Sequence, residues 1–243
     1  MQMLSDQQLQ RYAISHAPSY KQEMFDALVS SVADHFGSAG FKHMDIGGGT
    51  GWFADMLLEQ FPNCTSLIVD PANVLLEQNR PHDNKRLVCA RVEEMDKYVQ
   101  DERFDLITLN WVLHHLVLRS YAKTRAHMVD VLRRLRSRLS PGGRISVVEI
   151  VVDGFVLHAM PSKMIHALTS SRLLAPLMRG LGSNAAGAGV CFQTEDQWTA
   201  TFAQAGLAVA ERRLWGPWYA TSCKRILLHL RSSQDGSFWL ARA

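Results

Sequence analysis

The sequence predicts an α/β fold in which a doubly wound, mostly parallel sheet of seven strands is covered by helices. Short apolar runs rich in β-branched residues alternate along the chain with segments whose apolar residues recur at three- and four-residue steps. The first of these runs leads into a glycine-rich loop and then into a helical pattern. With 243 residues, 47% of them hydrophobic, the chain is long enough to bury the large core of such a sheet.

Each element follows from a local pattern. An apolar face with helical spacing covers 20–36 and stops at Gly37, and Pro18 separates it from a shorter possible helix at 4–14. Further helices are expected, in chain order, at 52–60, 74–78, 126–139 and 194–205, the last capped by Thr194. Strands are expected at 41–46, 65–69, 87–92, 104–109, 144–152, 207–214 and 224–230.

Two stretches depart from this alternation. Residues 153–193 contain Pro161, Pro176 and a loose run of Gly, Ser, Asn and Ala, which predicts a helical insertion after the fifth strand. Residues 232–243 show no pattern, and we expect them to form a tail.

Composition narrows the possible partners. The 26 Lys and Arg exceed the 23 Asp and Glu by too little to favour nucleic acid or a membrane as the main partner. The four cysteines (Cys64, Cys89, Cys191 and Cys223) are far apart, without a nearby His at ligand spacing, so we expect neither disulfides nor a metal site. No apolar run is long enough to span a membrane and no targeting segment is apparent, so we expect a cytoplasmic protein.

The glycine loop indicates a nucleoside ligand. Gly47, Gly49 and Gly51 form a G-x-G-x-G loop, whereas the dinucleotide fingerprint needs a glycine where this chain has Trp52. Asp70 ends the second strand, 19 residues after Gly51, where a carboxylate can accept hydrogen bonds from two ribose hydroxyls. The alternatives are a loop that serves only the turn and an Asp70 that caps the next helix.

Together with later motifs, this loop resembles the class I S-adenosylmethionine-dependent methyltransferases that act on small molecules. The resemblance covers 41–152 and rests on Asp45-Ile46-Gly47-Gly48-Gly49-Thr50-Gly51, Asp70, Phe104-Asp105-Leu106-Ile107, Val112-Leu113-His114-His115-Leu116 and Leu139-Ser140-Pro141-Gly142-Gly143. It implies a Rossmann-like cofactor-binding core at 41–152, an N-terminal helical lid at 1–40 and a second lid in the insertion at 153–193. Residues 194–231 would complete the same domain.

The resemblance also implies which residues bind S-adenosylmethionine. Asp45 would hold the amino group of the cofactor, the three loop glycines would pass beneath its methionine part, and Asp70 would bind the ribose. Asn110 would offer an oxygen to the ammonium group of the cofactor. The side chains of Pro71, Val92 and Met95 would line the pocket for its adenine. Where the family often has an acidic residue at the end of the third strand, this chain has Arg91, so we expect Glu93 to contact the adenine amino group.

Five side chains are candidates for the chemistry itself or for contact with the sulfonium. His114 and His115 stand at the cofactor edge of the sheet, where an imidazole can act as a general base near neutral pH. Tyr12 and Tyr20 in the leading segment, with Trp111, can steady the sulfonium through cation-π contact.

Three functions remain compatible with these residues. The first is methyl transfer to a small molecule, with S-adenosylhomocysteine as the product and no metal required. The second is intramolecular ring closure of S-adenosylmethionine to azetidine-2-carboxylate and methylthioadenosine, and the third is a non-catalytic binding module. The basic run Arg133, Arg134, Arg136 and Arg138 lies off the apolar stripe of its helix, so we interpret it as a solvated face rather than a nucleic-acid site. The sequence leaves open the methyl acceptor and the oligomeric state.

Overall fold

The computed structural model describes residues 19–217 and 222–243. Within them, seven strands form one sheet in the order β3-β2-β1-β4-β5-β7-β6. The strands are β1 (Lys42–Ile46), β2 (Thr65–Asp70), β3 (Lys85–Cys89), β4 (Phe104–Asn110), β5 (Leu139–Gly154), β6 (Leu207–Pro217) and β7 (Leu230–Arg242). The first five pair in parallel, whereas β7 is antiparallel to both β5 and β6. This arrangement confirms the predicted fold class.

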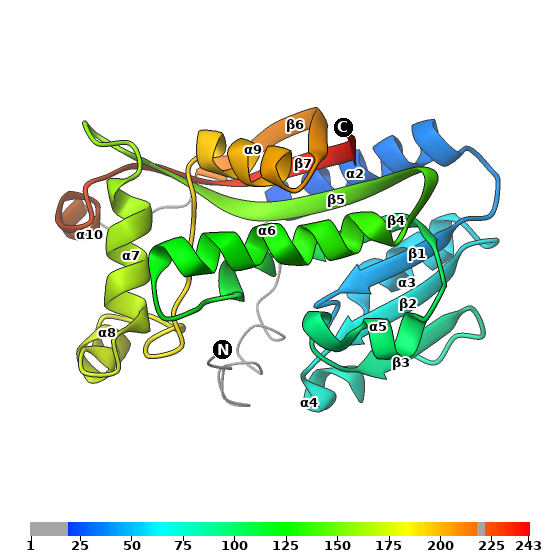
Figure 1. Cartoon of the computed structure of the whole chain (residues 1–243), viewed down its shortest axis with the longest axis horizontal. Coiled ribbons are helices and arrows are strands. Elements are labelled where there is room, and N and C mark those ends of the chain that lie inside the picture. Colours follow the sequence, from blue (N-terminus) through cyan, green and yellow to red (C-terminus); the bar gives the residue numbers. More distant parts are fainter. Residues whose placement is uncertain (1–18, 218–221) are drawn as a thin grey trace.

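Helices cover both faces of the sheet (Figure 1). The α-helices are α2 (Ser19–Phe36), α3 (Trp52–Gln60), α4 (Asn73–Leu76), α5 (Asp96–Val99), α6 (Tyr121–Ser137), α7 (Met160–Ser170), α8 (Ala175–Gly180), α9 (Glu195–Gln204) and α10 (Ser222–Leu227), and two short 3-10 helices are η1 (Val92–Glu94) and η2 (Leu113–His115). Buried residues of α5, α6 and α9 share the main core cluster, and those of α2 and α3 share a second cluster. The sheet is therefore doubly wound.

The local signals at helix ends are confirmed. In α2, the residues that set the predicted helical spacing, such as Met24, Phe25 and Val32, are buried. Thr194 caps α9 through a capping box, in which the Thr194 hydroxyl accepts from the Gln197 backbone N–H and the Gln197 side chain accepts from the Thr194 N–H. The helix considered at 4–14 lies outside the described residues.

The expectations for the last segment are wrong in two places. Residues 222–227 form α10 where a strand is expected, and residues 230–242 form β7 where a tail is expected. The segment Ser232 to Ser237 lacks the β-branched residues that mark strands, but β5 and β6 pair with it on both sides. Phe238 and Leu240 are buried there, so tertiary pairing overrides the weak local propensity.

The register of the sheet brings several strand ends to one edge. Ile46 of β1 is level with Val69 of β2 and Leu109 of β4. Asn110, which ends β4, is level with Val148 of β5. Ligands of open α/β sheets bind at the carboxyl ends of parallel strands, so the residues that follow these positions are the candidates for a site.

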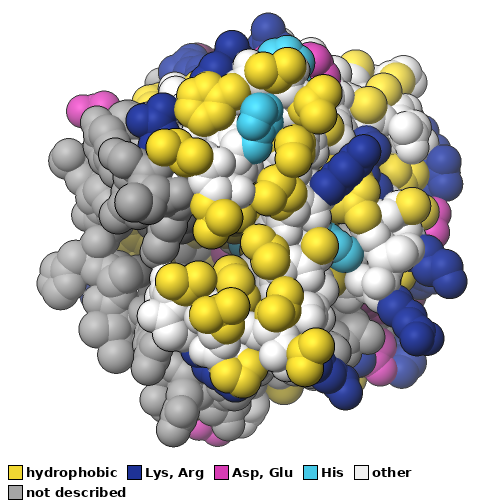
Figure 2. Space-filling view, turned by 90° about the vertical axis from the view of Figure 1, so that its left-hand side faces the viewer, with side chains coloured by type: hydrophobic (Ala, Val, Ile, Leu, Met, Phe, Trp, Pro, Cys, Tyr) yellow, Lys and Arg dark blue, Asp and Glu magenta, His cyan; other side chains and the backbone are white. Residues whose placement is uncertain are grey.

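The insertion lies at the end of the molecule to which these carboxyl ends point (Figure 1). β5 leads directly into it, and α7 and α8 confirm its helical character. Its surface carries many exposed hydrophobic side chains (Figure 2). Cys191, at its far end, donates its backbone N–H to the His114 carbonyl at 2.9 Å, so the insertion contacts the strand-end region.

Candidate functional site

The loop between β1 and α3 depends on its glycines. Gly47, Gly49 and Gly51 have φ values of 69°, 51° and 76°, in the left-handed region that favours glycine. A Cβ at Gly47 would collide with Val112, and one at Gly51 with Asn79. The Asn79 amide donates to the Gly49 carbonyl at 2.8 Å and so ties the loop to the end of α4. The sequence offers no signal for this role of Asn79.

Asp70 holds the same loop from the end of β2. Its Oδ2 accepts from the Gly49 N–H at 3.0 Å and its Oδ1 from the Ala72 N–H at 2.7 Å. Burial raises the pKa of the Asp70 carboxyl, while these two hydrogen bonds oppose the rise. A carboxylate has about four lone-pair positions, so acceptor capacity remains for two hydroxyls.

Asp45 lies under the loop with one oxygen unpaired. Its side chain is 1% exposed, and the Thr108 hydroxyl donates to Oδ1 at 2.7 Å. The other oxygen, Oδ2, is buried without a hydrogen-bond partner among the described residues. Burial raises the pKa of Asp45 to about 7, opposed by the Thr108 hydrogen bond and assisted by the charge of Asp70.

A buried histidine extends this contact across three strands. His43 Nε2 lies 2.8 Å from the Thr108 hydroxyl, and its Nδ1 lies 2.8 Å from the Ser66 hydroxyl. Burial lowers the pKa of His43 to about 3, so the ring is neutral. The Thr108 hydroxyl donates its hydrogen to Asp45, so it can only accept from His43. We therefore infer that His43 Nε2 donates to Thr108 and that His43 Nδ1 accepts from the Ser66 hydroxyl. The chain of hydrogen bonds is thus directed toward Asp45.

Asn110 and Trp111 follow on β4. Asn110 Oδ1 is buried and has no hydrogen-bond partner in the described part of the chain. It lies two positions after Thr108, so it faces the same side of the sheet as Asp45. Trp111 has a φ of 56°, rare for a large side chain, and its indole N–H donates to the buried Asp235 at 2.8 Å.

The two candidate histidines differ in their surroundings. His114 Nδ1 lies 2.6 Å from Oε2 of Glu149, a fully buried residue of β5, and the His114 backbone N–H donates to Oε1 at 3.3 Å. His115 lies with its ring 4.1 Å from that of His114, and burial, then the proximity of His114, lowers its pKa well below the ordinary value. Glu149 is the one acidic residue within the mostly apolar run 145–152, a signal that could have identified it.

The residues expected around the adenine are spread over two environments. Pro71 is exposed, whereas Val92 and Met95 are both buried in the main core cluster. Glu93 Oε1 accepts from His127 at 2.8 Å, and Oε2 has no hydrogen-bond partner within the described residues. Of the two tyrosines, Tyr12 lies outside the described residues, and for Tyr20 only its place in the first turn of α2 is described.

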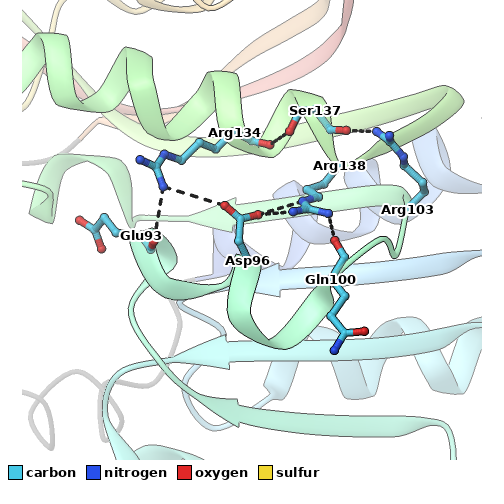
Figure 3. A network of polar contacts seen from close by, with 7 residues as sticks. All are labelled: Glu93, Asp96, Gln100, Arg103, Arg134, Ser137 and Arg138. Atoms are coloured by element: carbon cyan, nitrogen blue, oxygen red, sulfur yellow. Dashed lines mark hydrogen bonds and ion pairs between the residues drawn. The ribbon is translucent and has the colours of Figure 1, made fainter.

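The basic run of α6 is engaged in contacts within the chain (Figure 3). Arg138 contacts Asp96 at 2.5 Å and the Gln100 carbonyl, and Arg134 lies 3.9 Å from the same Asp96. Arg136 donates to the Gly206 carbonyl at 3.3 Å. These contacts give the run a structural role. Among residues 19–217 and 222–243, no group of three His, Cys, Asp or Glu is arranged to hold a metal.

Comparison with known proteins agrees with this geometry. Residues 44–145 match the family model described as a methyltransferase domain. The chain is 32% identical over 114 residues to the N-terminal Xaa-Pro-Lys N-methyltransferase 1 of Danio rerio, a match covering 44% of this chain and 47% of that protein. It is 24% identical over 138 residues to the malonyl-[acyl-carrier protein] O-methyltransferase of Priestia megaterium, covering 51% and 49%. The chain thus spans about half the length of the curated relatives it matches.

The fold similarity extends over nearly the whole chain. The magnesium protoporphyrin IX methyltransferase of Synechocystis, solved with bound S-adenosylhomocysteine, superposes with a TM-score of 0.59 at 11% identity. This similarity covers 98% of our chain and 93% of that structure. With the matched domain, the glycine loop and the acidic residues at the strand ends, the chain carries a class I S-adenosylmethionine-dependent methyltransferase domain.

Proposed function

We propose that this protein transfers the methyl group of S-adenosylmethionine to a small molecule, as enzymes of secondary metabolism do. One observation carries the proposal: two buried oxygens without partners, Asp45 Oδ2 and Asn110 Oδ1, lie on one side of the sheet beside the glycine loop. A buried acceptor without a hydrogen bond lowers the stability of the protein. A ligand with several N–H donors removes this penalty by donating to both oxygens. The α-ammonium group of the cofactor has three such donors.

The remaining polar groups of the site fit the rest of the cofactor. Asp70 has acceptor capacity left for the ribose hydroxyls, and it already orients the loop through Gly49. The unpaired Oε2 of Glu93 would accept from the adenine amino group. The left-handed glycines keep side chains away from the loop backbone, so that the methionine part can approach it closely.

We expect His114 to act as the general base. The Glu149 carboxylate accepts the Nδ1 hydrogen, which leaves the lone pair of the neutral ring on Nε2. In the reaction, a lone pair of the acceptor forms the bond to the methyl carbon, and the electrons of the broken carbon–sulfur bond stay on sulfur. The proton of the acceptor passes to Nε2. The cofactor supplies the activated methyl group, and the chain supplies orientation and exclusion of water.

A small-molecule acceptor is supported by the names of the relatives. The Synechocystis enzyme is named for magnesium protoporphyrin IX and the Priestia megaterium enzyme for malonyl-[acyl-carrier protein]. The Danio rerio relative is named for a peptide N-terminus, so a peptide amine is the competing acceptor class.

The test is to identify the product by mass spectrometry. We expect the purified protein with S-adenosylmethionine alone to stay nearly idle, and to form S-adenosylhomocysteine when a small-molecule library supplies the acceptor. Enzyme-dependent methylthioadenosine with an azetidine amino acid, formed without acceptor, would overturn methyl transfer in favour of ring closure. Calorimetry that detects no cofactor binding at millimolar concentration would leave only a non-catalytic module.

A further inference from the structure

The end of the molecule formed by the insertion and α10 exposes large aliphatic side chains. Leu173, Leu177 and Leu181 are spaced by four residues along α8 and its flanks, and they are 89%, 60% and 45% exposed. A stripe with this spacing normally faces the core of a globular protein. Here it faces outward.

The loop before α7 and the end of α10 continue this surface. Val156, Leu157, Ile226 and Leu227 are 76%, 61%, 77% and 64% exposed. The two segments are joined through His229, whose Nε2 accepts from the N–H groups of Val156 at 2.9 Å and Leu157 at 3.2 Å. We call the exposed aliphatic side chains of the 155–160 loop, α8 and α10 the apolar end. Figure 2 shows hydrophobic side chains spread over this face, with Lys and Arg among and around them and a few Asp and Glu toward its edges.

The charges around the apolar end are mostly positive, and the nearby Asp153 is paired with His158 and Arg231. Residues 154–194 contain Lys163, Arg172 and Arg179 and not a single Asp or Glu. The three cations are exposed, as is Arg225 on α10. The net charge of +3 for the whole chain hides this local excess, because acidic residues elsewhere offset it. An exposed apolar patch surrounded by cations is a mark of an interaction site for an anionic partner.

We propose that the apolar end docks onto an anionic lipid bilayer, with its aliphatic side chains between the headgroups and its cations on the lipid phosphates. No helix in the described part of the chain is long and apolar enough to span a membrane, so this contact is interfacial. A second copy of the chain fits less well, since a two-fold pairing would bring cations to cations without acidic partners. Nucleic acid fits less well because aliphatic side chains do not stack on bases.

Binding to vesicles tests the proposal, using the full chain without cofactor. We expect it to co-sediment with vesicles of phosphatidylcholine containing phosphatidylserine, and at least tenfold more weakly with phosphatidylcholine alone. Leu177→Glu should weaken binding at least tenfold, whereas Leu87→Glu, which alters an exposed leucine of β3, should not change it. The double change Lys163→Gln and Arg179→Gln should weaken binding to the anionic vesicles about 25-fold, because each cation near such a surface contributes about fivefold. Arg80→Gln, an exposed cation beyond α4, is the control.

Three results would overturn the proposal. They are no binding to either vesicle, equal binding to both, and light scattering that shows a dimer in which Leu177→Glu restores the monomer while vesicles stay unbound. Thermal melting shows that each variant is folded. Because no step uses S-adenosylmethionine, failure of the proposed methyl transfer would leave this result intact, and the reverse also holds.

Discussion

His114 and Glu149 form a buried pair in which Nδ1 of the ring lies 2.6 Å from Oε2 of the carboxylate. The pair joins the segment after β4 to the middle of β5, one residue beyond Val148, which is level with Asn110 at the end of β4. A carboxylate in this place orients the ring and stabilises the imidazolium that forms when the ring takes up a proton. Glu149 is therefore a positioning residue for the proposed base.

Replacing Glu149 by Gln should lower kcat with little change in binding. We expect kcat to fall about 100-fold, because the charge that stabilises the protonated ring is lost. The KM for the acceptor and the Kd for the cofactor should change less than about threefold. Steady-state kinetics and calorimetry measure both. A fall in kcat that comes with an equal fall in the folded fraction would assign Glu149 a structural role only.

Substitution of His114 and substitution of His115 should have different effects on kcat. His114→Gln is expected to lower kcat about 100-fold or more, since the proposed base is removed. His115→Gln is the matched control, because its ring lies beside that of His114, while the proposed base is the His114 ring that contacts Glu149 Oε2. We expect its kcat to stay within about threefold of the original. Equal losses in both variants would contradict the assignment of the base to His114.

Asp70→Ala should weaken binding of S-adenosylmethionine by about 1.5 to 3 kcal/mol, because two ribose hydroxyls lose a charged acceptor. Asp105→Ala is the control: its carboxylate accepts from the Lys42 N–H at 2.8 Å at the opposite end of β1, away from the loop. Calorimetry should show an unchanged Kd for this control. The same Kd for both variants would refute the ribose assignment of Asp70.

Gly49→Val should abolish cofactor binding while the fold survives. A Cβ at Gly49 would meet Leu75 Cδ1 at 3.4 Å, an ordinary contact, so the protein itself leaves room for it. Gly142→Val is the matched control, with a φ of 78° and open space around its Cβ position. Both variants carry the same left-handed strain of about 1 to 2 kcal/mol, but only Gly49 lies in the proposed site. Circular dichroism verifies folding, and binding by the Gly49 variant would exclude close backbone contact.

Cofactor binding should release a proton at pH 6. The pKa of Asp45 is raised to about 7, so its carboxyl is mostly protonated at that pH, while the amino group of the cofactor is already charged. A bound ammonium favours the carboxylate, so affinity should rise with pH up to about 7 and then level off. Calorimetry in buffers of different ionisation enthalpy measures the number of protons released on binding, from the change in the observed binding enthalpy between buffers. Asp45→Asn should bind more weakly and release none, and an unchanged count in this variant would refute the contact.

The parts of the fold that could be predicted are those that depend on neighbouring residues. The Thr194 cap is local, because Gln197 completes it within one turn, and the glycine loop is local in the sense that its left-handed φ values require glycine at those positions. β7 could not be predicted, since its polar sequence becomes a strand only between β5 and β6. Two site residues could not be predicted for the same reason, which is that their roles depend on tertiary contacts. His43 and Asn79 acquire their roles from segments that the fold brings to them.

The order of synthesis has a consequence for β7. Residues 230–242 leave the ribosome after every other strand of the sheet, yet they lie between β5 and β6. Asp235, on this strand, accepts the hydrogen bond that anchors the strained Trp111 beside Asn110. A nascent chain that stops short of this strand has its glycine loop and Asp70 but lacks the anchor of Trp111. Trp111 therefore acquires this anchor only after the last strand of the sheet has been translated and has paired with β5 and β6.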